Sequence, residues 1–177
     1  MTVLLLATIS ALGGPAFRHS GTAYSAIWQV PELRPVHSPS GEIAGWAAAG
    51  CGFSGEDCDI LLPRMNVFLP IPPGSEPVLR VEALGTAGMD GSVCRVLPAG
   101  GGDEFVVADP SGLPGDWGGL EGISSFRGFS LARVSLYPVI LSGGSLLTAS
   151  SLRIVLDHGS ASRPTAVTGA EGDLLRL

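Results

Sequence analysis

The sequence contains no lysine, and all ten of its basic residues are arginine. Charged residues make up 15% of the 177 residues and aromatic residues 6%, and the formal net charge is -6. No run of basic residues is present. A protein that binds nucleic acid needs a positive stripe to meet the phosphates, so this composition argues against a nucleic-acid partner.

Residue types that carry catalysis are also scarce. The three histidines are His19, His37 and His158, and none lies in a nucleophile motif. A Cys or Ser nucleophile needs a base within hydrogen-bond reach, so we expect three surface histidines and no catalytic site. The glycine run 100–102 is followed by neither Lys-Ser/Thr nor a helix, which excludes a phosphate-binding loop. The sequence therefore predicts no cofactor.

The longest apolar run is residues 1–12, MTVLLLATISAL, which is too short to span a membrane. Small residues follow it, as a signal peptidase requires. We interpret residues 1–16 as a signal segment that is cleaved between about Gly13 and Ala16. A buried first strand is the alternative. Cleavage would make this a secreted or cell-surface protein that does not span the membrane.

Glycine and proline are abundant, with 26 and 14 residues, and 45% of the chain is hydrophobic. So much turn chemistry favours short strands over long helices. Alternation of apolar and polar residues predicts strands at 24–30 and 78–84. We expect an antiparallel β-sandwich of about eight short strands in residues 17–158. The other expected strands lie at 42–46, 64–69, 92–97 and 104–108, and 109–122 is expected to be irregular.

The clearest pattern is a long C-terminal hairpin. Residues 129–141 and 145–157 flank Ser142-Gly143-Gly144, and paired glycines tolerate the positive φ of a tight turn. Pro138 donates no ladder hydrogen bond, so it should lie at an edge or a bulge. Residues 159–177 are expected to form a linker.

Three cysteines remain to be assigned. In a secreted protein, the simplest interpretation is a disulfide between Cys51 and Cys58, although Cys94 could replace either partner. A zinc site with His37 lacks the usual ligand spacing and a fourth ligand. Calcium could bind an acidic loop, but a solvated turn is the simpler interpretation. We therefore predict no metal site; the acidic residues of that loop are Glu56, Asp57 and Asp59.

Two segments resemble a known family when they are taken together and in order. Residues 59–75, DILLPRMNVFLPIPPGS, and the following strand 78–83 are similar to a pattern in the N-terminal propeptides of gingipain-type cysteine peptidases. Residues 126–139, the Gly-Gly turn and residues 152–156 resemble the hairpin at the end of that propeptide. The last five residues, 173–177, look like the start of a helix that leads into a catalytic domain.

This resemblance implies a β-sandwich that packs against a cognate cysteine peptidase domain, helps it fold and keeps it latent. Residues 159–177 would then lead toward a catalytic domain that this chain does not contain. The resemblance also implies a basic inhibitory residue, for which Arg95 and Arg127 are the candidates. The alternative is a free-standing secreted adhesion or carbohydrate-binding sandwich, in which Trp46 and Trp117 stack on sugar rings unless they pack in the core.

Overall fold

The computed structural model describes residues 13–37, 41, 43–54, 61–89, 94–95, 106–107, 113–126 and 129–159. For 94–95, 106–107, Phe126 and Phe129, the backbone alone is described. Within these ranges the chain forms strands and no helix, which confirms the all-β prediction. The thirteen strands are β1 (Arg18–Ser20), β2 (Ala23–Gln29), β3 (Arg34–His37), β4 (Ile43–Ala47), β5 (Gly52–Ser54), β6 (Leu62–Ile71), β7 (Val78–Gly88), β8 (Cys94–Arg95), β9 (Val106–Val107), β10 (Gly118–Phe126), β11 (Phe129–Leu136), β12 (Val139–Ser142) and β13 (Ser145–Asp157).

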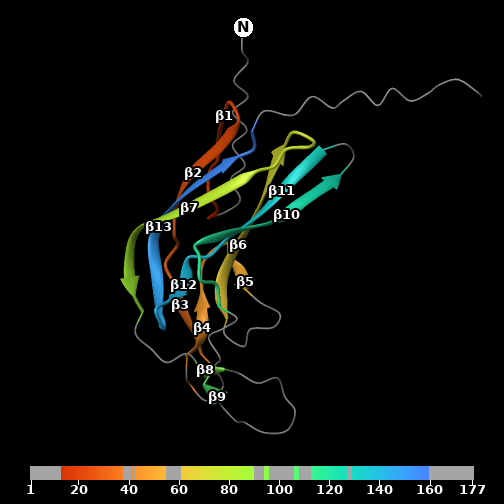
Figure 1. Cartoon of the computed structure of the whole chain (residues 1–177). Coiled ribbons are helices and arrows are strands. Elements are labelled where there is room, and N and C mark those ends of the chain that lie inside the picture. Colours follow the sequence, from red (N-terminus) through yellow and green to blue (C-terminus); the bar gives the residue numbers. More distant parts are fainter. Residues whose placement is uncertain are drawn as a thin grey trace, which may run out of the picture.

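Two larger sheets form the sandwich (Figure 1). The first, which we call the β13 sheet, has the order β1-β2-β13-β12. Strands β12 and β2 pair with successive parts of β13, and β7 pairs along the opposite side of β13. The second, the β11 sheet, has the order β10-β11-β6-β5. All of these strand pairs are antiparallel. Two small ladders, β3-β4 and β8-β9, lie at the lower end in Figure 1.

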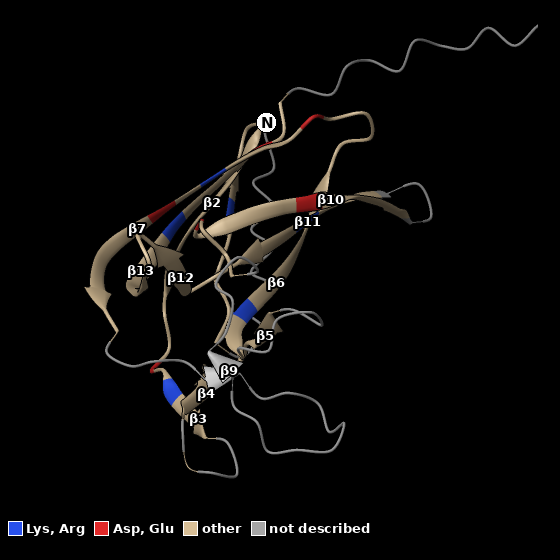
Figure 2. Ribbon diagram, turned by 60° about the horizontal axis from the view of Figure 1, so that its bottom comes forward, with Lys and Arg blue, Asp and Glu red and all other residues tan. Residues whose placement is uncertain are grey.

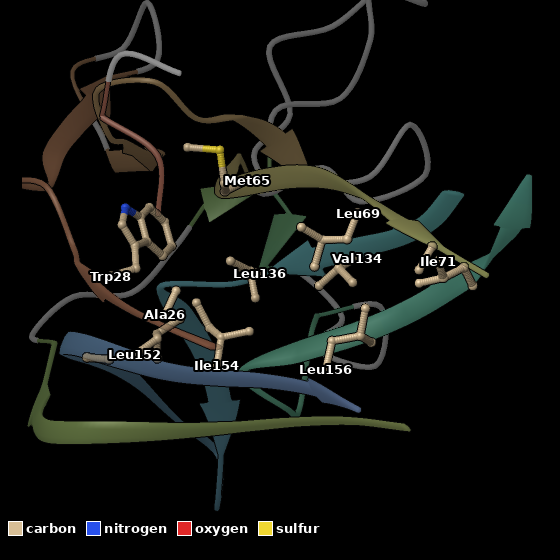
Figure 3. Packing of buried hydrophobic residues seen from close by; sticks show 12 residues of the cluster. Ala26, Trp28, Met65, Leu69, Ile71, Val134, Leu136, Leu152, Ile154 and Leu156 are labelled. Carbon is tan, nitrogen blue, oxygen red and sulfur yellow. The ribbon is translucent and has the colours of Figure 1, made fainter. Parts of the chain in front are cut away.

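The main core lies between the two sheets. Alternate residues of β13 point inward, and their partners across the core come from β6 and β11 (Figure 3). Burying one such Leu or Ile side chain contributes roughly 1.5–3 kcal/mol. This shared core makes the two sheets one folding unit. Its buried members are Ala26, Trp28, Met65, Leu69, Ile71, Ala132, Val134, Leu136, Ala149, Leu152, Ile154 and Leu156.

A second, smaller core lies beneath the first. It joins Trp46 of β4 to Leu62 of β6, Val139 of β12 and Leu146 of β13. A close contact fixes β4 here, because a Cβ on Gly45 would overlap the Leu61 carbonyl oxygen. The chain therefore needs glycine where β4 meets β6.

The predicted long hairpin is correct only around its turn. Gly143 and Gly144 adopt φ of 58° and 80°, and β12 pairs with β13 over four residues. The rest of the expected first arm is β11, which pairs with β6 and β10 in the opposite sheet. Pro138 is fully buried at the break, and its carbonyl accepts a hydrogen bond from Ala149 N at 3.1 Å. The chain thus crosses between sheets at the proline.

Other strand bounds also differ from the prediction. We expected β6 to end before Pro70, but it continues to Ile71, because pairing with β11 extends to Ile71↔Ser130. The region 109–122 was expected to be irregular, yet β10 begins at Gly118 and pairs with β11 through a bulge after Leu120. Strands near 24–30, 42–46, 64–69 and 78–84 are confirmed. No helix in the described ranges is long and apolar enough to cross a membrane.

Candidate functional site

Cys51 lies just before β5, with its backbone N–H bonded to the Ala48 carbonyl at 3.1 Å. Its side chain is half-buried against the main core, and burial raises the pKa of the thiol to about 11. A thiol with a raised pKa is a poor nucleophile at neutral pH, so Cys51 is a structural cysteine. Cys58 lies outside the described residues, and the Cys51–Cys58 disulfide stays a prediction. Cys94 opens β8.

The two arginines expected to act on a peptidase belong to different regions of the sandwich. Arg95 is the second residue of β8, at the lower end in Figure 1. Arg127 lies outside the described residues, but it follows Phe126, which pairs with Phe129 at the far end of the β10–β11 hairpin. That end lies well away from β8 in Figure 1. The described neighbours of these two arginines thus lie in separate regions of the sandwich.

The prediction of three surface histidines is wrong for His158, which is only 5% exposed. His19 Nε2 lies 3.0 Å from His158 Nε2, and Tyr24 packs beside both rings. The three residues come from β1, β2 and the residue after β13. His37 is exposed in β3 and contacts the Gly41 carbonyl at 3.1 Å. Sequence reasoning missed this cluster, because 139 residues separate the two histidines.

The surface of the sandwich carries little charge, and Figure 2 shows charged positions only sparsely along the strands. The ion pairs that the structure describes are exposed, with Arg153–Glu82 at 3.4 Å and Arg34–Glu32 at 3.8 Å. Pairs of this kind contribute little to stability.

Exposed large hydrophobic residues concentrate on the β11 sheet. Leu120 and Ile123 of its edge strand β10 are opposite the buried Val134 and Ala132. Residues directly opposite each other in a ladder lie on the same face of the sheet. Leu120 and Ile123 therefore lie on the core face of the β11 sheet, but at its edge they remain exposed. Four of the six exposed large hydrophobics that the structure describes belong to this sheet, namely Phe53, Phe68, Leu120 and Ile123.

An apolar groove of about 280 Å³ opens at the other edge of the sandwich. Phe17 and Tyr24 form one wall, and residues 65–70 of β6 form the other. β5 pairs with β6 only as far as Arg64, so no described strand covers this side of β6 beyond that residue. Among the described strands, the β11 sheet thus has apolar side chains and no pairing partner at its β10 edge and along β6 beyond Arg64, which makes it the candidate docking surface.

Both tryptophans proposed to stack on sugars contact the hydrophobic cores. Trp46 is 5% exposed in the smaller core, and Trp117 is partly buried against the main core. In the described part of the chain, no group of three or more His, Cys, Asp or Glu residues could hold a metal ion. The acidic loop 56–59 lies outside that part.

Comparison with solved structures confirms the fold implied by the sequence resemblance. A structure that addresses the zymogenic latency of gingipain K from Porphyromonas gingivalis matches with a TM-score of 0.60, over 84% of this chain and 94% of that one, at 17% identity. A complex of the pro- and mature domains of RgpB from the same organism matches with a TM-score of 0.61, over 82% and 84%, at 11% identity. No protein-family model and no curated protein matches the sequence.

Proposed function

We propose that this chain is the propeptide of a secreted gingipain-like cysteine endopeptidase, which it helps to fold and keeps latent. The observation that carries the proposal is the similarity of nearly the whole sandwich to a chain from a study of gingipain zymogen latency. The ordered motifs at 59–75 and 126–156 support it independently, because they were identified from the residues alone. The catalytic residues belong to the peptidase in this proposal.

The β11 sheet is the surface through which we propose that the peptidase binds. Its apolar edges suit a protein partner, since exposed apolar patches mark interaction sites more often than chance. The β10–β11 hairpin belongs to the same sheet and leads to Arg127. A docked β11 sheet would therefore hold this arginine close to the peptidase, whereas Arg95 belongs to the small β8-β9 ladder.

The alternative, a free-standing carbohydrate-binding sandwich, has less support. It relied on exposed aromatic residues, and both Trp46 and Trp117 contact the cores. We therefore favour a protein partner over a glycan.

The test begins with the DNA that follows the codon for Leu177. We expect the reading frame, or an adjacent gene, to encode a peptidase domain with a Cys nucleophile and a His base. Expressed separately, that domain should be recovered in greater active yield when this chain is co-expressed. Adding the purified chain to the active peptidase should abolish its hydrolysis of a peptide substrate. If no such domain is encoded, or the chain leaves the peptidase fully active, the proposal fails.

A further inference from the structure

His19 of β1 and His158, the residue after β13, form a head-on hydrogen bond, and we call these two residues the histidine pair. Their Nε2 atoms lie 3.0 Å apart, their ring centroids lie 5.3 Å apart, and the ring planes differ by 25°. The rings therefore lie end to end along the line that joins the two nitrogen atoms. Such a bond needs one nitrogen that donates a proton and one that accepts it.

The backbone around His158 determines which nitrogen of the pair accepts. Nδ1 of His158 lies 2.9 Å from the Gly159 carbonyl oxygen, which can only accept, so this Nδ1 carries a proton. In the neutral ring Nε2 is then the acceptor, and the Nε2–H of His19 donates to it. The His158 backbone N–H donates to the Thr22 carbonyl at 2.8 Å, which fixes His158 beside the β1–β2 turn.

The two rings respond differently to protonation. A proton on Nδ1 of His19, whose side chain is exposed, leaves its Nε2–H in place and the hydrogen bond intact. A proton on His158 must take the accepting Nε2, and the N–H groups of two charged rings would then oppose each other 3.0 Å apart. The closed pair therefore holds at most one added proton, whereas separated rings hold two.

On the inner side of the sheet, no fixed charge among the described residues faces the histidine pair. Tyr24 lies opposite His19 in the β1–β2 ladder, and its ring centroid is 4.5 Å from that of His19 and 5.8 Å from that of His158. Burial raises the pKa of the Tyr24 phenol, so this group stays neutral. Residues 65–70 of β6, which form the opposite wall of the apolar groove, include no ionisable side chain.

The charged residues nearest to the pair along the chain point to the outer face. Arg18 and Asp157 are exposed there, because the neighbour of each along its strand points inward. Asp157 accepts a backbone N–H at 3.0 Å. Glu76 and Arg80, before and within β7, are exposed as well, and the ion pairs that the structure describes include neither histidine. Among the described side chains, none is therefore placed to neutralise a second proton on the pair.

Little else in the described chain holds β1 to the sheet. The strand has three residues, all of them exposed, and among the described strands it pairs with β2 alone. The structure describes two links from β1 and its turn to the end of β13, namely the histidine pair and the hydrogen bond between Thr22 and His158.

From this geometry we propose that the histidine pair is a pH-sensitive latch, which holds β1 and the β1–β2 turn to the end of β13 near neutral pH and releases them when a second proton binds. Histidine is the side chain that ordinarily titrates between about pH 5 and 8. Because release takes up one proton, the ratio of released to held β1 rises by up to about tenfold per pH unit below the transition. The chain passes from His158 into residues 159–177, so in a propeptide the latch also controls the exit toward the peptidase; this consequence alone rests on the proposed function.

The experiment measures amide hydrogen exchange in the full chain by NMR between about pH 7.5 and 5.0, with each rate corrected for the intrinsic effect of pH. We expect the protection of the β1 and His158 amides to fall at least about tenfold over this range. Protection of the β11 amides, in the opposite sheet, should not change. The range ends above the usual titration of carboxyl groups, which lies near about pH 4.

Three variants separate the latch from a general effect of acid. His158→Gln places an amide oxygen close to the position of Nε2, and this oxygen accepts from His19 in either charge state, so protection should stay high at about pH 5. His19→Ala removes the donor from an exposed position, and protection should be low at both ends of the range. His37→Ala is the matched control, since His37 is an exposed histidine of β3 outside the pair, and it should keep the pH dependence of the wild type.

Protection of β1 that does not change with pH in the wild type would overturn the proposal, and so would wild-type pH dependence in His19→Ala. Loss of protection at about pH 5 in a folded His158→Gln variant would have the same meaning. All of these measurements use the chain by itself, so their outcome does not depend on whether a peptidase partner is found.

Discussion

Gly118 allows the two sheets to approach each other at the start of β10. A Cβ at this position would lie 2.8 Å from Val81 Cγ2 of β7 and 3.0 Å from the Ser135 carbonyl oxygen. Neither neighbour moves easily, because valine is stiff at χ1 and the carbonyl belongs to β11. Overpacking of this kind costs about 1–3 kcal/mol. Alanine also lowers the conformational entropy of the unfolded chain relative to glycine, and this stabilisation offsets about 0.4–1 kcal/mol of that cost.

The expected result for Gly118→Ala is a net loss of about 1–2 kcal/mol, or a melting temperature lower by about 2–8 °C for a domain of this size. Gly119→Ala is the control, because its Cβ would meet only Glu121 Oε1, at 3.8 Å. That variant should match the wild type or gain up to about 1 kcal/mol. Urea unfolding followed by tryptophan fluorescence measures both. Equal stability of the two variants would refute the argument that the sheets touch at Gly118.

Three further predictions concern the candidate functional residues. If the Cys51 thiol is free, its alkylation by iodoacetamide at about pH 8 should be about 100-fold slower than in urea, since its pKa is about 11 in the fold against 9.0 for an exposed thiol. Equal alkylation rates in the fold and in urea would contradict the raised pKa. Because the folded state holds the thiol proton more tightly, Cys51 does not change the free energy of unfolding below the pKa of the unfolded thiol, and it lowers that free energy as the pH rises toward the pKa of the folded thiol. Ile123→Asp should raise the inhibition constant for the peptidase at least tenfold, which corresponds to about 1.4 kcal/mol. Val78→Asp changes a similarly exposed residue on the β13 sheet and should leave the inhibition constant unchanged. Similar increases in both variants would exclude the β11 sheet as the docking surface. Arg127→Ala should raise the inhibition constant and Arg95→Ala should leave it unchanged, and the reverse result would transfer the inhibitory role to β8.

The period-two pattern predicted which side chains enter the core. Leu79, Val81 and Ala83 alternate with Arg80 and Glu82, and the structure packs the first three against the main core and exposes the other two. This prediction works because side chains on a strand alternate between faces whatever the partner strand is. Local sequence therefore determines the face of a strand.

The partner of each strand was not predictable in the same way. The sequence around Pro138 is compatible with a bulged hairpin. Only the pairing of β11 with β6, from Ser130↔Ile71 to Leu136↔Met65, shows that the chain changes sheets. The contact between His19 and His158 depends on β13 pairing with β2, which places both chain segments at one corner. No local pattern encodes such pairings. The same limit left Arg95 and Arg127 as equivalent candidates.

The open edges of the β11 sheet and the proposed latency function explain each other. An edge strand with exposed apolar side chains tends to associate with other chains, and natural sheets commonly protect such edges with charge. Here the chain has few charges, and β10 presents Leu120 and Ile123 at its edge. A propeptide that is made together with its peptidase has this edge covered as soon as the two fold, so protective charge is unnecessary. Binding would in turn stabilise the sandwich by mass action, and the affinity that keeps the peptidase latent would also keep the propeptide soluble.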